Sequence, residues 1–219
     1  KKLKKYILKR KFKLKGNNVF YVSHNIELNP AKYFPYSKSN PELFNDELSI
    51  LSALGKINKS VIYKSYPTKQ YLFDRNKIIA KHVKKYKNIR IFKGEEDFRY
   101  VRAIADIIIT QSSESTLEWC IGSNVPLIFL DSDYYEPLEN HKVKKAFEES
   151  FFLFNYDRLN WEKEMIDFLN LPYEEILKRW KEKEIFRKKY DNKYFLSSKK
   201  YAGGIGSKLL FELINEDNN

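Results

Sequence analysis

The 219-residue sequence has little of what several classes of protein require. Its single cysteine, Cys120, excludes an internal disulfide and a cysteine-based metal cage. No apolar run approaches the roughly 18 residues that a membrane-spanning helix needs. The first residues are charged and no apolar segment of a secretory signal follows them, so we expect a protein of the reducing cytoplasm. The sequence holds neither a Walker-type phosphate loop nor a His-Glu-x-x-His zinc motif.

Positive charge is abundant, with 41 Lys and Arg residues against 29 Asp and Glu residues and a formal net charge of +12. Much of it lies in residues 1–16, KKLKKYILKRKFKLKG, where apolar side chains alternate with basic ones. Such a segment either contacts an anionic membrane, at about 1 kcal/mol per basic residue, or is a solvated linker or helix that enters the domain. Charge alone also suits a nucleic-acid binder. No helix-turn-helix or RNA-binding signature supports that, so we expect no nucleic-acid partner.

Apolar runs rich in β-branched and aromatic residues alternate with helical patterns along the chain. They predict strands at residues 18–23, 61–64, 88–94 (with a turn), 106–110, 125–130 and 151–154. The helical patterns lie at 40–55, 72–86, 96–104, 139–149, 160–170 and 173–190, with a short one after residue 116 and a last one after a glycine-rich start at 203–206. Since 42% of the residues are hydrophobic, the chain can bury a core.

This alternation predicts an α/β fold: a Rossmann-like parallel sheet with helices on both faces, plus C-terminal helices. We expect two parts, a basic linker or membrane-proximal segment at 1–16 and a Rossmann-like domain with C-terminal helices at 17–219. The first long helix is expected to have Asn40 as its N-cap and to end at Gly55. Trp119 and Phe129 are expected in the core.

Ligands of such sheets bind where the strands end, near the point at which the strand order reverses. Polar residues follow the predicted strands there, and the densest group is Gln111-Ser112-Ser113-Glu114-Ser115-Thr116. Small hydroxyl residues at the start of a helix let a phosphate approach the unpaired N–H groups. The alternative is that these residues only cap the helix.

The stretch Ile104–Leu130 resembles the donor-binding stretch of GT-B glycosyltransferases. It is most similar to the CDP-glycerol glycerophosphotransferases and the bacterial capsule, Kdo and sialic acid transferases. The matching residues are Ala105-Asp106, Ile109-Thr110, Ser112-Ser113 and the run 124–129, NVPLIF. These families carry a His-Pro pair after an earlier strand, where this sequence has Tyr66 before Pro67. A tyrosine can donate one hydrogen bond but carries no positive charge.

The resemblance implies that the chain is the donor-binding half of a two-domain enzyme, which the start at Lys1 rather than Met also suits. It implies that Glu118 meets the ribose hydroxyls. His24, after the first strand, is a candidate acid or base, and His141 is a candidate contact for the base or ribose. The full set of candidate donor-binding residues is Gln111, Ser112, Ser113, Glu114, Ser115, Thr116, Glu118, Tyr66, Pro67, Lys64, Lys93 and His141.

The function that this implies is transfer of a sugar or polyol phosphate from a CMP-, CDP- or UDP-linked donor, in synthesis of a bacterial surface polysaccharide or a teichoic-acid-like polymer. The acceptor is a glycan or lipid-linked, and the location is the cytoplasm, with the inner membrane face as the site of any peripheral contact. We expect no cofactor and no metal, although Asp131-Ser132-Asp133 spells the D-x-D of metal-binding GT-A enzymes. The alternative is a non-catalytic nucleotide- or partner-binding domain that lost the histidine of the His-Pro pair.

Overall fold

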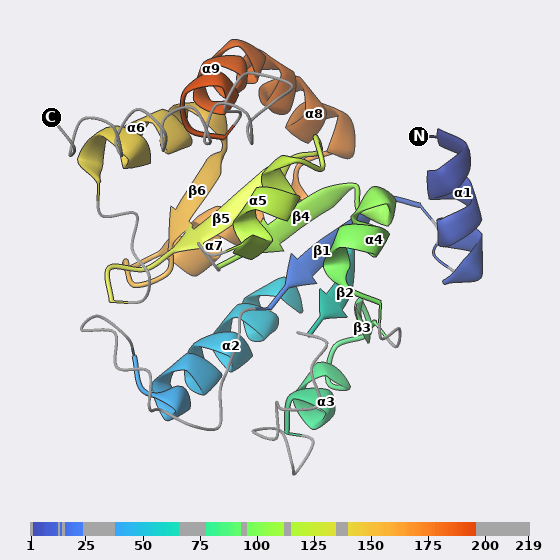
Figure 1. Cartoon of the computed structure of the whole chain (residues 1–219). Helices are drawn as coiled ribbons and strands as arrows, with labels where there is room; N and C mark the ends of the chain where they lie inside the picture. Colours follow the sequence, from blue (N-terminus) through green and yellow to red (C-terminus); the bar gives the residue numbers. More distant parts are fainter. Residues whose placement is uncertain are drawn as a thin grey trace, which may run out of the picture.

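A computed structural model describes residues 2–12, 14, 16–23, 38–65, 78–92, 96–111, 115–134 and 140–195 (Figure 1). The strands are β1 (Asn18–Val22), β2 (Ser60–Lys64), β3 (Ile89–Ile91), β4 (Ile107–Thr110), β5 (Leu127–Asp131) and β6 (Phe152–Asn155). The α-helices are α1 (Lys2–Lys11), α2 (Asn40–Leu54), α3 (Ile78–Val83), α4 (Phe98–Val101), α5 (Ser115–Ile121), α6 (His141–Ser150), α7 (Trp161–Asn170), α8 (Tyr173–Glu182) and α9 (Glu184–Tyr190). A 3₁₀ turn, η2 (Arg102–Ile104), follows α4, and a π-helical turn, η3 (Asp191–Phe195), follows α9.

The described strands form one six-stranded sheet in the order β3-β2-β1-β4-β5-β6, and every neighbouring pair is parallel. The central strands β1, β4 and β5 are buried along their whole length. Both faces of such strands are covered, which is why their sequences read as unbroken apolar runs. The predicted Rossmann-like fold is therefore confirmed.

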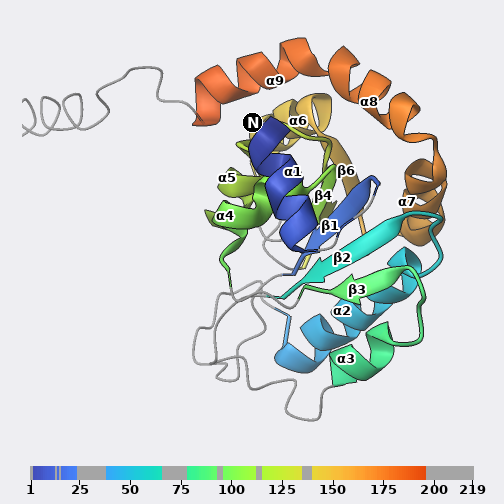
Figure 2. The same cartoon turned by 90° about the vertical axis from the view of Figure 1, so that its right-hand side faces the viewer.

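Helices cover the two faces of the sheet (Figures 1 and 2). The helices α2 and α3 lie on one face, where α7 also packs against α2. On the opposite face lie α1, α4 and α5, with α1 against η2. Right-handed crossovers explain why the helices divide between the two faces. From the middle of the sheet, the strands β1, β2 and β3 follow one another in one direction and β4, β5 and β6 in the other, so their connecting helices lie on opposite faces.

Helices α8 and α9 enclose the β6 end of the sheet, and α9 packs on α6. Aromatic rings fill this region. The ring of Phe151 lies 4.6 Å from that of Phe147, 5.3 Å from that of Tyr190 and 6.1 Å from that of Trp180, centroid to centroid. Aromatic pairs at these separations contribute about 0.5–1.5 kcal/mol each beyond the area they bury, so the C-terminal helices are part of the same folded unit.

Three local expectations are corrected. The N-cap of α2 is Ser39, one residue before Asn40, because the Ser39 N–H and Oγ both donate to the Glu42 carboxylate in a capping box. The helical pattern at 173–190 is two helices that meet at Lys183. Trp119 is 39% exposed and so is not a core residue, since Leu117 and Cys120 are the α5 side chains that face the sheet.

Other expectations lie partly outside the described residues. Of the helix predicted at 72–86, the structure describes Ile78–Val83. The turn at Tyr66-Pro67 and the glycine-rich start at 203–206 lie outside the described ranges. Within those ranges no helix is long and apolar enough to cross a membrane.

Asp106 fastens α1 to the amino ends of the two central strands. Its carboxylate accepts hydrogen bonds from Lys5 Nζ at 2.6 Å, Lys9 Nζ at 2.7 Å and the Asn18 backbone N–H at 2.9 Å. The Asp106 side chain is almost fully buried. A buried carboxylate that accepts three such bonds contributes more than an exposed ion pair.

We predict that Asp106→Ala lowers the free energy of unfolding by about 2–4 kcal/mol, because two lysines and one backbone N–H lose their acceptor. Urea unfolding measures the change. Limited trypsin digestion of the folded variant should also cut faster within α1. Asp167→Ala is the matched control: it removes the exposed Lys163–Asp167 pair and should change stability by no more than about 0.5 kcal/mol. Equal losses of stability in the two variants would contradict the conclusion that buried Asp106 holds α1 on the sheet.

Candidate functional site

The carboxyl ends of the described strands meet at one edge of the sheet, because all neighbours are parallel. The strand order reverses between β1 and β4, so the crevice beyond these two strands is the expected ligand position. Ser23 follows β1 there and Gln111 follows β4. Both side chains are buried.

A buried polar network lies at this edge of the sheet, where the strand order reverses. Glu47, which projects from α2 and has no exposed surface, accepts hydrogen bonds from the Tyr21 hydroxyl and from Gln111 Nε2, the latter at 3.0 Å. Gln111 Nε2 also lies 3.0 Å from the Tyr21 hydroxyl. The network therefore joins β1, the end of β4 and α2 at the point of strand reversal.

Burial dominates the electrostatics of this network. It raises the pKa of the Glu47 carboxyl, although hydrogen bonds from Tyr21, Tyr63, Ser23 and Gln111 oppose the rise. Burial, with the nearby Glu47 carboxylate, also raises the pKa of the Tyr21 hydroxyl well above its ordinary value. Glu47 is thus a carboxyl group whose proton is retained to higher pH in the folded state than in the unfolded chain.

Lys64 is a buried cation at the end of β2. Only 3% of the residue is exposed, and its Nζ donates to the Ser65 carbonyl at 3.3 Å and lies 5.3 Å from the centroid of the Phe92 ring. Within the described ranges no carboxylate forms an ion pair with it. Burial lowers the pKa of Lys64, and the more distant Asp97 and Glu96 offset only part of that. An ammonium group held in this way is suited to an anion.

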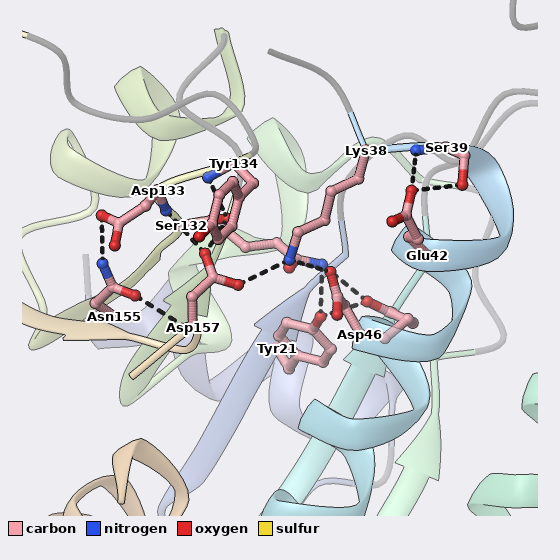
Figure 3. Close-up of polar contacts among 12 residues, drawn as sticks. Tyr21, Lys38, Ser39, Glu42, Asp46, Ser132, Asp133, Tyr134, Asn155 and Asp157 are labelled. Carbon is pink, nitrogen blue, oxygen red and sulfur yellow. Dashed lines mark hydrogen bonds and ion pairs between the residues drawn. The ribbon is translucent and has the colours of Figure 1, made fainter. Parts of the chain in front are cut away.

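A second polar cluster ties the segment before α2 to the ends of β5 and β6 (Figure 3). Lys38 Nζ lies 2.8 Å from Asp46 Oδ2 and 2.8 Å from Asp157 Oδ1. Burial lowers the pKa of Lys38, but its bonds to the two carboxylates outweigh this and raise the pKa overall. The Nζ also lies 4.6 Å from the centroid of the Tyr156 ring. Lys38 therefore crosslinks three segments of the chain at the carboxyl edge.

The loop after β5 is fixed by the same cluster. Asp157 accepts from Ser132 Oγ at 2.6 Å and from the Asp133 backbone N–H at 2.8 Å, and Ser132 Oγ accepts from the Tyr134 backbone N–H at 3.1 Å (Figure 3). Asn155 Nδ2 donates to Asp133 Oδ1 at 2.8 Å. Burial alone would raise the pKa of Asp157, yet the bonds from Lys38, Ser132 and Asp133 lower it below its ordinary value.

The D-x-D sequence is engaged with protein groups. Asp131 pairs with Lys144 Nζ at 2.6 Å, and Asp133 accepts from Asn155. Among the described residues, no group of three or more His, Cys, Asp or Glu side chains is arranged to hold a metal ion.

The described site residues predicted from the sequence do not all lie in one place: two are buried at the carboxyl edge and others are on the surface of helices. Gln111 lies inside the buried network and Lys64 lies buried at the end of β2. Thr116 is half-buried and Glu118 exposed on α5, and His141 is exposed at the first position of α6, after the N-cap Asn140. Of Ser115, the structure describes the backbone, as the first residue of α5. The remaining predicted residues lie outside the described ranges: His24, Tyr66, Pro67, Lys93, Ser112, Ser113 and Glu114.

Sequence reasoning missed the acidic and tyrosyl members of this edge. Glu47 carried a signal, because it stands three or four positions from Leu43, Phe44 and Leu51, on the apolar stripe of α2. A carboxylate in an apolar stripe needs partners inside the protein. Lys38, Asp46 and Asp157 had no such signal, since their contacts join positions up to 119 residues apart.

A separate hollow of about 600 Å³ lies beside the edge strand β6, with Phe152, Phe168, Lys183 and Phe186 in its wall. Lys183 Nζ donates to the Glu148 carbonyl at 2.6 Å and to the Glu149 carbonyl at 3.1 Å. These bonds satisfy carbonyls at the end of α6. The hollow lies between helices at the sheet's side and is not part of the carboxyl edge.

Comparison with known proteins shows the fold. No family model and no curated protein matches the sequence. Among solved structures, 89% of the chain superimposes on each of three proteins. These are WaaG, a glycosyltransferase involved in lipopolysaccharide biosynthesis (TM-score 0.52, 14% identity), Anabaena HepE in complex with UDP and glucose (0.58, 10%), and the N-terminal domain of Candida albicans trehalose-6-phosphate phosphatase (0.54, 14%).

The chain spans about half the length of these structures, covering 48%, 49% and 42% of them, respectively. Its fold therefore matches half of a GT-B glycosyltransferase. At these identities the likeness concerns the fold.

Two glutamates of α2 should respond to pH in opposite directions. Between the ordinary carboxyl pKa of 4.5 and the raised pKa of Glu47, the unfolded chain loses the proton while the folded chain keeps it. Glu47 thus lowers the free energy of unfolding as pH rises, by at most about 1.4 kcal/mol per pH unit. Glu47→Gln should become more stable relative to the parent across this window, as urea unfolding at several pH values would measure.

Glu42→Gln is the matched control on the same helix. Hydrogen bonds from Ser39 lower the pKa of Glu42, so its stabilisation is present above pH 4.5 and lost as pH falls through the lowered value. This variant should become less stable than the parent as pH rises through that range. The same sign of pH dependence in both variants would refute the pKa shift of Glu47.

Proposed function

We propose that the chain is the donor-binding half of a metal-independent GT-B-type transferase. The donor is a nucleotide-activated sugar or polyol phosphate, with CMP-, CDP- and UDP-linked donors as the candidates. The observation that carries the proposal is the buried Lys64 ammonium at the carboxyl edge of the sheet, which has no carboxylate partner among the described residues. A nucleotide phosphate supplies the missing negative charge. The GT-B-like fold supports the same conclusion.

The phosphate-binding part of the proposed site joins two segments. Lys64 at the end of β2 supplies a positive charge, and the segment after β4 supplies the predicted Ser112 and Ser113 hydroxyls and the backbone amides that follow them. These groups stabilise the negative charge that develops on the departing nucleotide phosphate. Transfer is a displacement at the carbon or phosphorus next to that phosphate: the acceptor oxygen forms the new bond as the bond to the leaving phosphate oxygen breaks.

The remaining candidates have supporting roles in this proposal. Glu118 meets the ribose hydroxyls, His141 the base or ribose, and His24 is the candidate acid or base. Gln111 holds the end of β4 in place beside β1 and α2 through its bonds to Glu47 and Tyr21. In this proposal the acceptor is a glycan or a lipid-linked molecule of a bacterial surface polymer, and the reaction takes place on the cytoplasmic side of the membrane.

A non-catalytic binding domain is the second candidate, since Tyr66 stands where the resembling families have histidine. Calorimetry with CMP, CDP and UDP measures binding. Transfer from the matching nucleotide-linked donor to a lipid or glycan acceptor, measured with the longest natural form of the chain, separates the two candidates. Binding without transfer supports the second one.

Substitutions of Lys64, at the carboxyl end of β2, and of Lys59, before its amino end, test the proposed anion site. Lys64→Met should weaken nucleotide binding about 10- to 100-fold, because a hydrogen bond to a charged group contributes about 1.5–3 kcal/mol. The same substitution should raise the free energy of unfolding without ligand, because a buried ammonium is removed. Calorimetry and urea unfolding measure the two effects.

Lys59 is the control for Lys64. It precedes β2 at the amino edge, burial lowers its pKa too, and its Nζ donates to the Leu169 and Leu171 carbonyls. Lys59→Met should cost about 1–2 kcal/mol of stability and leave nucleotide affinity unchanged. Unchanged affinity in Lys64→Met would reject the assignment of this lysine.

The serine pair provides an independent test. A thermal-shift screen of nucleotides and nucleotide sugars should show stabilisation by one base family. Ser112→Ala combined with Ser113→Ala should abolish the shift, because the hydroxyl donors to the phosphate are lost. Ser123→Ala, which removes an exposed hydroxyl bonded to the Trp119 carbonyl, is the control and should retain it. A screen without any shift would count against the proposed function as a whole.

A further inference from the structure

One face of the molecule combines exposed aromatic and aliphatic side chains with arginines. Tyr6 and Ile7 on α1 are 64% and 55% exposed, Tyr100 on α4 is 62% exposed, and Trp119 on α5 is 39% exposed. The helices that carry them lie side by side, with α1 against η2 and α4 against α5 (Figures 1 and 2). Four large apolar side chains therefore project from a single layer of helices.

The arginines of this face are held against its aromatic rings. The Arg102 guanidinium lies 5.0 Å from the centroid of the Trp119 ring, and its Nη1 donates to the Trp119 carbonyl at 3.1 Å. The Arg99 guanidinium lies 5.8 Å from the same ring and 5.3 Å from that of Tyr100. Each guanidinium has five N–H donors, so these contacts leave donors available for phosphate groups outside the protein.

The net charge of the face is positive. The acidic residues near α4 are already paired, Glu96 with Lys11 at 2.9 Å and Asp97 with Arg99 at 3.3 Å. Glu118 is the exposed carboxylate beside Trp119. On α1, residues 2–11 contain no acidic residue, and Arg10 is exposed next to Tyr6 and Ile7. Lys5 and Lys9 turn inward to Asp106, and Leu8 packs against the core, so the helix is held with Tyr6 and Ile7 facing outward.

We propose that the face formed by Tyr6, Ile7, Arg99, Tyr100, Arg102 and Trp119 docks on the surface of an anionic phospholipid bilayer. Tyrosine and tryptophan are enriched at the boundary between lipid headgroups and hydrocarbon, and basic residues gain attraction from anionic lipids. Isolated apolar side chains between arginines suit shallow insertion better than they suit a protein partner, whose anchors enter pockets. Three hollows of the described part lie elsewhere, along β6, α6, α8 and α9.

Vesicle binding of the full 219-residue chain tests this surface. In a flotation assay, the chain should float with vesicles of phosphatidylcholine and phosphatidylglycerol and not with vesicles of phosphatidylcholine alone. Arg99→Gln combined with Arg102→Gln should reduce binding roughly tenfold or more, since each basic residue contributes about fivefold. Tyr6→Ala with Ile7→Ala should reduce it by a similar factor. Leu159→Ala with Ile185→Ala, which removes two exposed apolar side chains from other helices and loops, should not.

Lipids brominated near the headgroup provide a direct readout of insertion. They should quench tryptophan fluorescence of the parent chain but not of Trp119→Phe, whose remaining tryptophans are Trp161 and Trp180. Substitutions at these exposed or half-buried positions should leave the fold intact, and circular dichroism of each variant checks this. Equal binding to both vesicle types, or unchanged binding in the variants, would overturn the proposal. Binding to single-stranded RNA without binding to vesicles would overturn it in favour of a nucleic-acid surface. Nucleotide affinity, measured without lipid, is a separate readout of the proposed donor site.

Discussion

A parallel sheet that is covered on both faces leaves room for polar side chains only at the two ends of its strands. Here the strand interiors are filled by residues such as Phe20, Ile108 and Phe129, all buried. A polar group within those layers would be desolvated without a partner. The burial of both faces therefore concentrates charge and hydrogen-bonding groups at the amino edge and the carboxyl edge, and the contrast between these edges is the basis for locating a site.

At the amino edge, several buried polar side chains have partners within the protein. Asp106 accepts from two lysines of α1 and from the start of β1, and Asn88 Nδ2 donates to the carbonyls of Leu54, Ile57 and Lys59. The carboxyl edge differs, because it holds the buried carboxyl of Glu47, whose pKa is raised, and the ammonium of Lys64, which donates to one carbonyl at 3.3 Å where Lys59 of the amino edge donates to two. Such groups cost stability, and they are common where a protein binds or transforms a ligand. This contrast is the physical reason for placing the donor site at the carboxyl edge.

The basic residues of the chain have several separate structural roles. Lys5, Lys9, Lys38 and Lys144 neutralise carboxylates that would otherwise be buried alone. Lys59 and Lys183 satisfy carbonyls at helix ends. A net charge of +12 is therefore weak evidence for any one ligand, and the informative cations are those with neither a carboxylate partner nor two carbonyl partners among the described residues. Lys64 meets that criterion inside the fold, and Arg102 meets it on the α1–α4–α5 face.

The sequence by itself determined the fold class, the six strands and most helix positions, because periodicity and turn residues are local and the strands are apolar throughout. It also indicated that Gln111 and Lys64 lie at the carboxyl edge, since residues at the ends of strands of a parallel sheet share one edge. It could not determine that Gln111 turns inward to Glu47, that Trp119 lies outside the core, or that Lys38 joins Asp46 to Asp157. Those facts depend on which segments, distant along the chain, the tertiary structure brings within about 3 Å of one another, the range over which a hydrogen bond acts.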